Sequence, residues 1–192
     1  MSDLNLIIGD INKLTSETTP FNFNNPPVDP VKLASDLVKS MYEYNGIGLA
    51  ANQIGLPYRV FCMRGTPENL VCFNPKIVTY SNESIELEES CLSFPGLIVK
   101  IKRPQHIRAR FQYPNGETVT RQYTGMTARI FQHELDHLDG KLYYTRAPRV
   151  IRDLAFKRMK KNVYAIQTNS NAVDNFLTDT LTKYNQFQSK NG

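Results

Sequence analysis

The sequence has no long uninterrupted run of apolar residues, and only three of its 192 residues are cysteines. No stretch approaches the roughly 18 consecutive apolar residues of a membrane-spanning helix, which argues against a helical membrane protein. The first residues lack the basic segment followed by an apolar segment that marks a secretory signal peptide. A small, odd number of cysteines argues against a disulfide framework and suits a reducing compartment. We therefore expect a cytoplasmic protein with no membrane partner.

Recognition motifs for nucleotides and nucleic acids are absent as well. There is no Walker loop, no C2H2 zinc-finger spacing and no internal repeat, so we expect no sequence-specific binding to nucleic acid. The net charge of +5 is modest, and the basic residues gather in two segments, 100–110 and 146–161. Such clusters are usually solvated faces, although their positive potential would also steer the protein toward an acidic partner.

The length and the apolar content of 41% predict one globular domain. We expect this domain to span residues 1–165 and to be followed by a polar extension, 166–192, rich in Asn, Thr and Gln. The apolar residues of the extension keep helical spacing, which favours an amphipathic helix over about 172–187 rather than a disordered tail.

Helices are predicted near both ends of the expected domain, after a non-helical arm. Residues 1–28 are polar and rich in Asn, Thr and Pro, and we expect an extended arm and loop there. Asp29 and Pro30 are typical of a helix start, and Asn45-Gly46 marks its end. The core positions of this helix are expected to be Val31, Leu33, Leu37, Val38 and Met41. Another helix is expected from about 149 to 165.

The middle of the chain has the pattern of β-strands. We expect strands at 58–64, 70–74, 76–81, 83–89, 97–103, 106–113 and 117–123. Asn74-Pro75 is interpreted as a break between two strands, and Pro114-Asn115-Gly116 as a hairpin turn. Strict alternation in 83–89 predicts that Ile85 and Leu87 face inward.

The most informative stretch is QHELDHL, residues 132–138, on a helix expected from Thr124-Gly125 to Asp139-Gly140. His133 and His137 stand four residues apart, so their side chains leave one helical face about a turn apart and can reach one metal ion. Glu134 projects beside them, where it can hold or deprotonate a water molecule. A charged, solvated helical face is the plainer interpretation, but the complete spacing on an apolar helix favours a metal site.

The third ligand is left open by the spacing alone. No Glu follows Glu134 and no His follows His137, which argues against the commonest HExxH protease types. Downstream Asp153, Asp174 and Asp179 remain formal alternatives. Among the upstream cysteines, whose thiolates are strong ligands, Cys62 and Cys72 lie in apolar strand interiors and are expected to be buried thiols. Cys91 lies where a strand gives way to a turn.

Three separated motifs together resemble the peptide deformylase family. They are GIGLAANQ (46–53), which fits the family pattern G-φ-G-φ-A-A-x-Q, ESCLS (89–93), and HELDH (133–137). They occur in family order and with family spacing, and a weaker likeness runs from about residue 30 to 160. Ser90 departs from the family, which usually has Gly at this position beside the metal ligand and along the substrate groove.

The resemblance implies an α+β fold of antiparallel sheets wrapped around a central helix that carries HExxH. It implies removal of the N-formyl group from the formyl-methionine of nascent polypeptides, with release of formate. One divalent metal ion, iron(II) in the family and replaceable by nickel or zinc, would be bound by Cys91, His133 and His137. Glu134 would move the proton, and Gln53 with the backbone N–H of Leu92 would stabilise the oxyanion.

The resemblance also implies a set of substrate-binding residues. The candidates are Gly46, Ile47, Gly48, Leu87, Ser90, Arg129 and Ile130, among which Ile47, Leu87, Arg129 and Ile130 would form the methionine pocket. The ribosome, where a deformylase meets the nascent chain, is acidic and could make transient contact with the basic face.

Two other functions are weighed against this one. An HExxH metallopeptidase would need a downstream ligand, and a non-catalytic ribosome-associated binding protein would not need Glu134 and Gln53.

Two polar residues, His106 and Asp136, are expected to have structural rather than catalytic roles. His106 is interpreted as an ordinary strand or surface histidine. Asp136 should point away from the metal face and pair with an arginine such as Arg103.

Overall fold

The computed structural model of the protein describes residues 5–166, with side chains described for 5–161. The helix expected over 172–187 lies outside the described residues. Within the described part, no helix is long and apolar enough to cross a membrane. The elements follow in the order α1 (Ile11–Leu14), α2 (Pro30–Glu43), β1 (Gly48–Ala50), η1 (Ala51–Ile54), β2 (Val60–Met63), β3 (Leu70–Tyr80), β4 (Ser84–Cys91), β5 (Phe94–Pro104), β6 (His106–Gln112), β7 (Thr118–Thr124), α3 (Gly125–Leu138), η2 (Tyr143–Arg146) and α4 (Arg149–Ile166).

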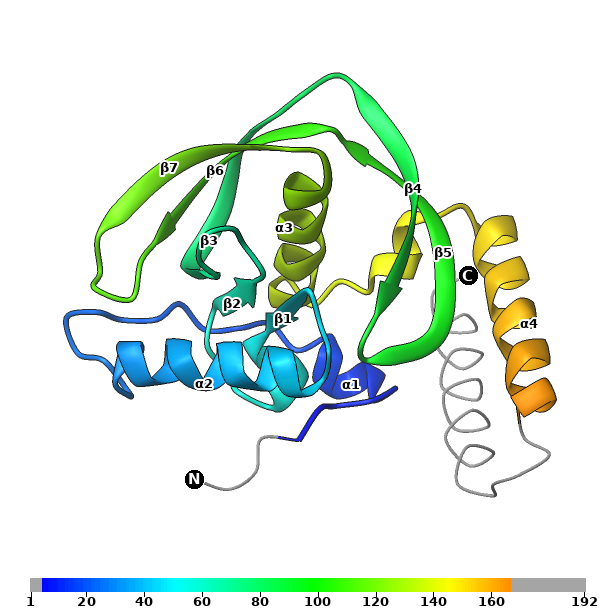
Figure 1. Ribbon diagram of the computed structural model, residues 1–192, viewed down its shortest axis with the longest axis horizontal. Helices are drawn as coiled ribbons and strands as arrows, with labels where there is room; N and C mark the ends of the chain where they lie inside the picture. The colour runs from blue at the N-terminus through cyan, green and yellow to red at the C-terminus, as the bar shows by residue number, and fades with distance from the viewer. Residues whose placement is uncertain (1–4, 167–192) are drawn as a thin grey trace.

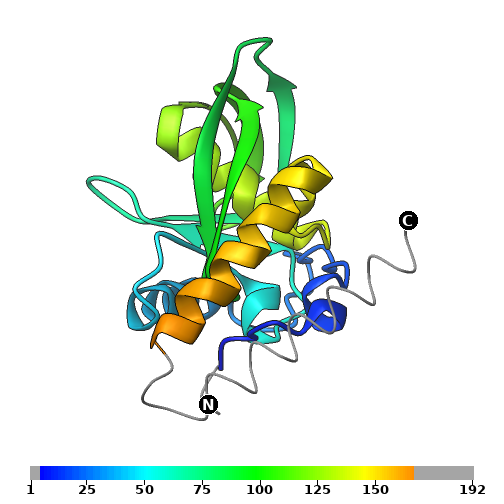
Figure 2. The same cartoon turned by 90° about the vertical axis from the view of Figure 1, so that its right-hand side faces the viewer.

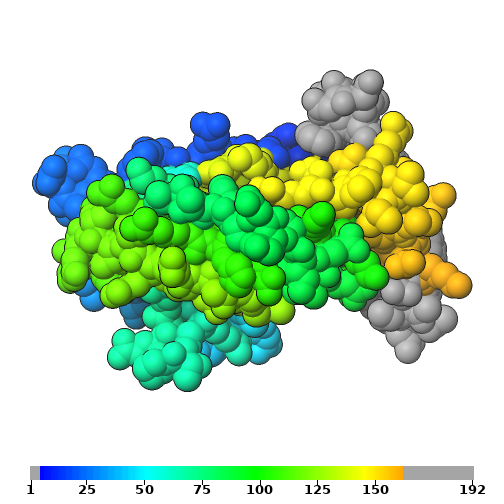
Figure 3. All heavy atoms as spheres, turned by 90° about the horizontal axis from the view of Figure 1, so that it is seen from above, coloured from blue at the N-terminus to red at the C-terminus, as the bar shows by residue number. Residues whose placement is uncertain are grey.

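The strands form two antiparallel sheets that enclose helix α3 (Figure 1). One sheet has five strands in the order β1-β2-β3-β6-β7, and the other is the ribbon β4-β5. Helix α2 lies beside β1 and β2, while α4 runs along β5 (Figure 2). Seen from above, the green strands form most of one face and α4, in yellow to orange, lies at one end (Figure 3). The predicted α+β architecture with a central HExxH helix is confirmed.

Helix α2 begins as the sequence predicts. The Asp29 side chain accepts a hydrogen bond from the Val31 amide at 2.9 Å, and Pro30 occupies the first turn. Leu33, Leu37 and Met41 are buried, which confirms the predicted core face. Val31 does not belong to that face, because it lies in the first turn of α2 and is 62% exposed.

The predicted strand break at Asn74-Pro75 is wrong. Strand β3 continues through both residues, and the ladder with β6 shifts register there. Asn74 adopts a positive φ of 49°, and its side chain accepts from the Phe21 amide and donates to the Phe21 carbonyl, both at 2.8 Å. The two residues therefore make a bulge, a place where a strand tolerates Pro.

The N-terminal arm holds more structure than the sequence predicts. Asp10 caps a four-residue helix, α1, and Ile11 and Leu14 are buried against the core cluster that includes β5 and α4. Farther along the arm, Phe21 is buried in the cluster around α2. So short a helix shows too little periodicity to be recognised in sequence, and its stability comes from this packing.

The β4–β5 ribbon corrects one further expectation. Leu87 is half-buried, but Ile85 is 39% exposed and does not reach the core. Ile85 lies near the end of the ribbon, where it pairs with Arg103 of β5. Two positions beyond Leu87, the acidic Glu89 is buried at 7% exposure.

Candidate metal centre

Helix α3 presents its two histidines toward one point, as the HExxH spacing predicts. The helix spans Gly125–Leu138, within about one residue of the predicted ends. His133 and His137 are 8% and 1% exposed, and their ring centroids lie 5.1 Å apart. Ala128, Phe131 and Leu138 anchor the same helix in the core under the five-stranded sheet.

Cys91 reaches the histidines from the end of β4. It pairs with Phe94 across a tight turn formed by Leu92 and Ser93, so the thiol lies at the tip of the β4–β5 hairpin. Its Sγ is 3.2 Å from His137 Nε2, and the ligand atoms of Cys91, His133 and His137 all lie within 4.8 Å of one another. Cys62 and Cys72 are buried elsewhere in the core, as expected.

This donor set fits a divalent transition metal. One thiolate and two imidazoles are ligands that such ions prefer, and three protein ligands leave a coordination position open for catalysis. The three groups are buried, and no other group of three ligating side chains is found in the described part of the chain.

Glu89 orients His133 through the ring nitrogen that faces away from the cluster. His133 Nδ1 and Glu89 Oε2 are 2.9 Å apart, which leaves Nε2 for a metal. Arg103 binds both oxygens of Glu89 at 2.6 and 2.8 Å, and Arg129 Nη1 donates to Oε1 at 2.7 Å. Burial alone would raise the pKa of Glu89, but the hydrogen bonds and charges of Arg103 and His133 outweigh it and lower the pKa well below its ordinary value.

Asp136 pairs with an arginine, as predicted from the sequence. Its carboxylate lies to one side of the two histidines on α3 and accepts a hydrogen bond from Arg103 Nη1 at 2.8 Å. Arg146, from η2, binds the same carboxylate through Nε at 2.6 Å and through Nη2. Arg103 therefore bridges two buried acidic groups, one beside the metal cluster and one behind it, and the predicted pairing is confirmed.

The GIGLAANQ segment passes close to the HExxH glutamate. A Cβ atom built on Gly48 would overlap Glu134 Oε1 and lie 2.8 Å from its Cδ, and one on Gly46 would lie 2.8 Å from the end of the Leu92 side chain. Neither glycine has a positive φ, so close approach is the reason for glycine here. Glu134 is 4% exposed, burial raises its pKa to about 7, and its Oε2 has no hydrogen-bond partner among the described residues.

Gln53 is held at the other side of the cluster. Its Oε1 accepts from the Ala50 amide at 2.9 Å, and its Nε2 donates to Ser93 Oγ at 3.1 Å and lies 3.6 Å from Cys91 Sγ. The side chain is 2% exposed. These contacts fix an amide donor beside the thiolate.

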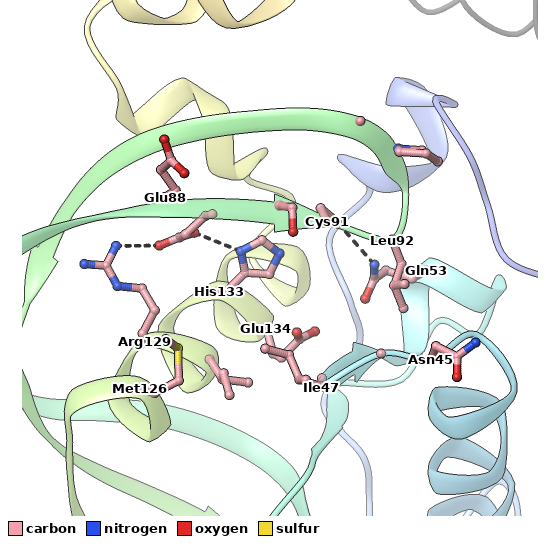
Figure 4. A pocket seen from close by; sticks show the side chains of 17 residues that line it. Asn45, Ile47, Gln53, Glu88, Cys91, Leu92, Met126, Arg129, His133 and Glu134 are labelled. Carbon is pink, nitrogen blue, oxygen red and sulfur yellow. Dashed lines mark hydrogen bonds and ion pairs between the residues drawn. The ribbon is translucent and has the colours of Figure 1, made fainter. Parts of the chain in front are cut away.

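A cavity of about 520 Å³ opens onto these groups (Figure 4). It brings together most of the residues predicted for the site. The lining consists of Asn45, Gly46, Ile47, Gly48, Gln53, Glu88, Glu89, Ser90, Cys91, Leu92, Pro95, Gly96, Met126, Arg129, Ile130, His133 and Glu134. The predicted residues Leu87 and His137 are not part of this lining. Glu89 and Met126 were not predicted as site residues from the sequence, although Glu89 belongs to the ESCLS motif.

Arg129 lines the cavity with its guanidinium turned away from it. Besides Glu89, the guanidinium donates to the carbonyl oxygens of Ile101 at 2.8 Å and Ile85 at 2.6 Å. The β4–β5 ribbon therefore pairs the positive charge of Arg129, so that only the aliphatic part of the side chain needs to contact an apolar group in the cavity.

Comparison with known proteins agrees with this geometry. A family model described as polypeptide deformylase matches residues 6–153. The chain belongs to the peptide deformylase family. It is 34% identical over 175 residues to the peptide deformylase of Wolbachia pipientis, covering 84% of this chain and 96% of that protein. It is 41% identical over 123 residues to that of Thermotoga neapolitana, covering 64% and 75%.

Solved structures of this family have the same fold. The peptide deformylase from Thermotoga maritima matches with a TM-score of 0.70 and 35% identity, over 76% of this chain and 98% of that one. A plant peptide deformylase matches with a TM-score of 0.76 and 27% identity, over 88% and 94%. This chain is accordingly an amide hydrolase of a family that uses one catalytic metal and acts on formylated peptides.

Proposed function

We propose that the protein hydrolyses the formyl amide of N-terminal formyl-methionine on newly made polypeptides, releasing formate and a free amine. The observation that carries this proposal is the convergence of Cys91, His133 and His137 beside a cavity that Cys91, His133 and Glu134 line. The family membership supports the reaction type. The apolar residues in the cavity wall support methionine as the first residue of the substrate.

Cys91, His133 and His137 would hold one divalent ion, which when bound supplies Lewis-acid activation of the carbonyl and of water. We propose iron(II) as the cellular metal, with nickel or zinc able to replace it. The soft thiolate of Cys91 favours such ions over magnesium or calcium.

Glu134 is proposed as the group that moves the proton. It would take a proton from the attacking water and give it to the leaving amine, so that the amide C–N bond breaks and formate departs. A carboxyl whose pKa is raised toward 7 by burial suits both halves of this task near neutral pH. The unpaired Glu134 Oε2 supports the assignment, because a buried carboxylate oxygen with no protein partner remains free to bind a reactant.

Gln53 and the backbone N–H of Leu92 are proposed to stabilise the oxyanion. The Gln53 amide is already aimed at the thiolate side of the cluster by its bonds to Ala50 and Ser93. A fixed, neutral donor is suited to developing negative charge because it needs no reorganisation and cannot take the proton from Glu134.

Ile47 and Ile130 are proposed as walls of the methionine pocket, with the aliphatic part of Arg129 between them. Gly46, Gly48 and Ser90 would line the path of the peptide backbone. Ile47 and the neighbouring Met126 are 54% and 57% exposed beside the cavity, so a bound apolar side chain would cover them. Leu87 lies two positions before Glu89 on β4 and does not line the cavity.

Residues 1–165 are proposed to form the catalytic domain. The exposed basic residues of α4, which include Arg149, Lys157, Arg158, Lys160 and Lys161, are proposed to make transient contact with the ribosome. We also propose a cytoplasmic location, because nascent chains are made there.

The test is formate release from formyl-methionyl peptides by metal-loaded protein, prepared without oxygen. Glu134→Gln should keep the metal and lose turnover by several orders of magnitude, because an amide cannot shuttle a proton. Unformylated peptides should not be cleaved internally. Absence of formate release, or a Glu134→Gln variant nearly as active as the parent, contradicts the proposal, and internal cleavage instead would favour a metallopeptidase.

A further inference from the structure

The two histidines of the metal centre are supported differently. His133 has its outer nitrogen, Nδ1, paired with Glu89 at 2.9 Å. His137 Nε2 faces Cys91 Sγ at 3.2 Å, which makes Nδ1 the nitrogen that faces away from the cluster. That Nδ1 is buried and has no hydrogen-bond partner among the described residues.

Asn52 supplies a matching unpaired atom. Its Nδ2 donates to the His137 carbonyl at 2.6 Å, so the two residues are already in contact. Its Oδ1 is also buried and has no partner in the described part of the chain. Asn52 is 6% exposed and lies in η1, directly before Gln53.

We propose that Asn52 is a positioning residue for the metal ligand His137. A histidine that ligates through Nε2 carries its hydrogen on Nδ1, and buried donors of this kind pair with an acceptor. Asn52 Oδ1 accepts this hydrogen through one buried water, and thereby fixes the ring orientation of His137 as Glu89 fixes that of His133. The inference rests on the proposed metal site, and position 52 is the variable x of the motif G-φ-G-φ-A-A-x-Q.

The chain offers a matched control for the structural part of the Asn52 contact. Thr18 Oγ1 donates to the carbonyl of Leu138, the residue after His137, at 2.9 Å and is equally buried. Thr18→Val removes a side-chain hydrogen bond to the same end of α3 without touching an imidazole. Asn52→Leu removes the corresponding bond to His137 and the acceptor Oδ1 as well.

The experiment measures zinc affinity by competition with a chromophoric chelator, together with the absorption bands of the cobalt(II)-loaded protein. Asn52→Leu should weaken zinc binding by about 10- to 100-fold and alter the cobalt bands, as loss of such a partner does in metal sites. Thr18→Val should lower the melting temperature of the metal-free protein. Its zinc affinity should stay within about threefold of the parent, and its cobalt bands should be unchanged. Equal loss of affinity in the two variants overturns the proposal.

A second variant separates acceptor from donor. Asn52→Asp keeps an oxygen for His137 Nδ1 and removes the N–H that binds the His137 carbonyl. Affinity closer to the parent than to Asn52→Leu supports the proposal, and loss as large as in Asn52→Leu shows that the donor alone matters. If Asn52→Asp does not fold, the comparison with Thr18→Val decides, with Asn52→Ala in place of Asn52→Leu where needed.

Failure of the proposed metal site itself has a different signature. Cys91→Ala must lower zinc affinity for the site to be correct. If it does, while Asn52→Leu does not, only the role of Asn52 is refuted. If Cys91→Ala leaves affinity unchanged, the ligand assignment is at fault.

Discussion

Gly48 lies so close to Glu134 that the side chain of any other residue at position 48 would collide with the carboxyl group. A Cβ atom there would be 2.8 Å from Glu134 Cδ, closer than carbon atoms in proteins approach. Strand β1 therefore acts as a wall that limits where this carboxylate can lie. The GIGLAANQ and HELDH motifs, which are far apart in the sequence, depend on each other through this contact.

The first prediction tests whether the absence of a side chain at Gly48 is needed for the position of Glu134. Gly48→Ala should displace Glu134 and lower kcat for formyl-methionyl peptides by about 100-fold or more, since removing a positioned proton-transfer group costs this much. Metal content should stay near that of the parent because no ligand is touched. Gly46→Ala is the comparison, in which the added methyl first meets the movable end of Leu92, and a smaller loss is expected. Parent-like activity in Gly48→Ala would show that the close approach is not required.

The second prediction concerns the buried charge of Glu89. Glu89→Gln leaves Arg103 and Arg129 without their shared carboxylate, and breaking a buried ion pair in this way typically costs about 3–5 kcal/mol. The free energy of unfolding of the metal-free protein, measured in urea, should fall by roughly this amount. Metal affinity should fall as well, by about tenfold or more, because His133 loses its acceptor.

Glu88→Gln is the control for this change. Glu88 directly precedes Glu89 in β4, is exposed, and lies opposite Lys100 in the ladder. A surface substitution of this kind changes stability by no more than about 0.5 kcal/mol. Similar losses in the two variants would mean that the buried network is not what holds the ribbon on α3.

The central helix could be predicted from sequence because its information is local. The spacing of His133, Glu134 and His137 specifies one face, and the apolar residues specify the opposite one, so Asp136 had to point elsewhere. Charge favoured a pairing of Asp136 with an arginine such as Arg103, but it could not predict that Arg146 binds the same carboxylate. The ligand role of Cys91 needed the resemblance, since nothing in the spacing separates it from a downstream Asp.

Other features could not be predicted because they depend on distant partners. Alternation in β4 marks Glu89 as inward-facing, but a carboxylate is normally expected outside. Its burial becomes possible only through Arg103 and Arg129, which stand 14 and 40 residues away. Asn74-Pro75 is a turn signal in isolation, and only the hydrogen bonds to Phe21 turn it into a bulge within β3.

A third prediction concerns the metal. Iron(II) beside the Cys91 thiolate is open to oxidation, whereas nickel(II) does not readily lose an electron in such a site. Activity of the iron-loaded protein should decay in air, and the nickel-loaded protein should persist. Turnover followed over time in air, with parallel anaerobic samples, measures this, and equal durability of both forms argues against iron. Cys91→Ala should lower metal content, and the equally buried Cys62→Ala should not.

The last prediction concerns Ser90, the one departure from the family motif. Ser90 is exposed, lines the cavity beside Cys91, and falls where the register of the β4–β5 ladder is interrupted. Ser90 therefore lies where we expect the substrate peptide to pass, and its side chain occupies space beside that peptide. Ser90→Gly should change KM, or the preference for the residue after methionine, by roughly tenfold at most, which is the scale of one small group in a binding site.

Metal content of Ser90→Gly should equal that of the parent, because the ligand Cys91 is held by the hairpin turn to Phe94 rather than by the preceding side chain. Ser84→Gly, at the exposed start of the same strand, controls for the added backbone freedom of glycine. Kinetics on a set of formyl-methionyl dipeptides and tripeptides would separate the two variants. Loss of metal in Ser90→Gly, or an equal kinetic change in Ser84→Gly, would show that Ser90 acts on the strand and not on the substrate.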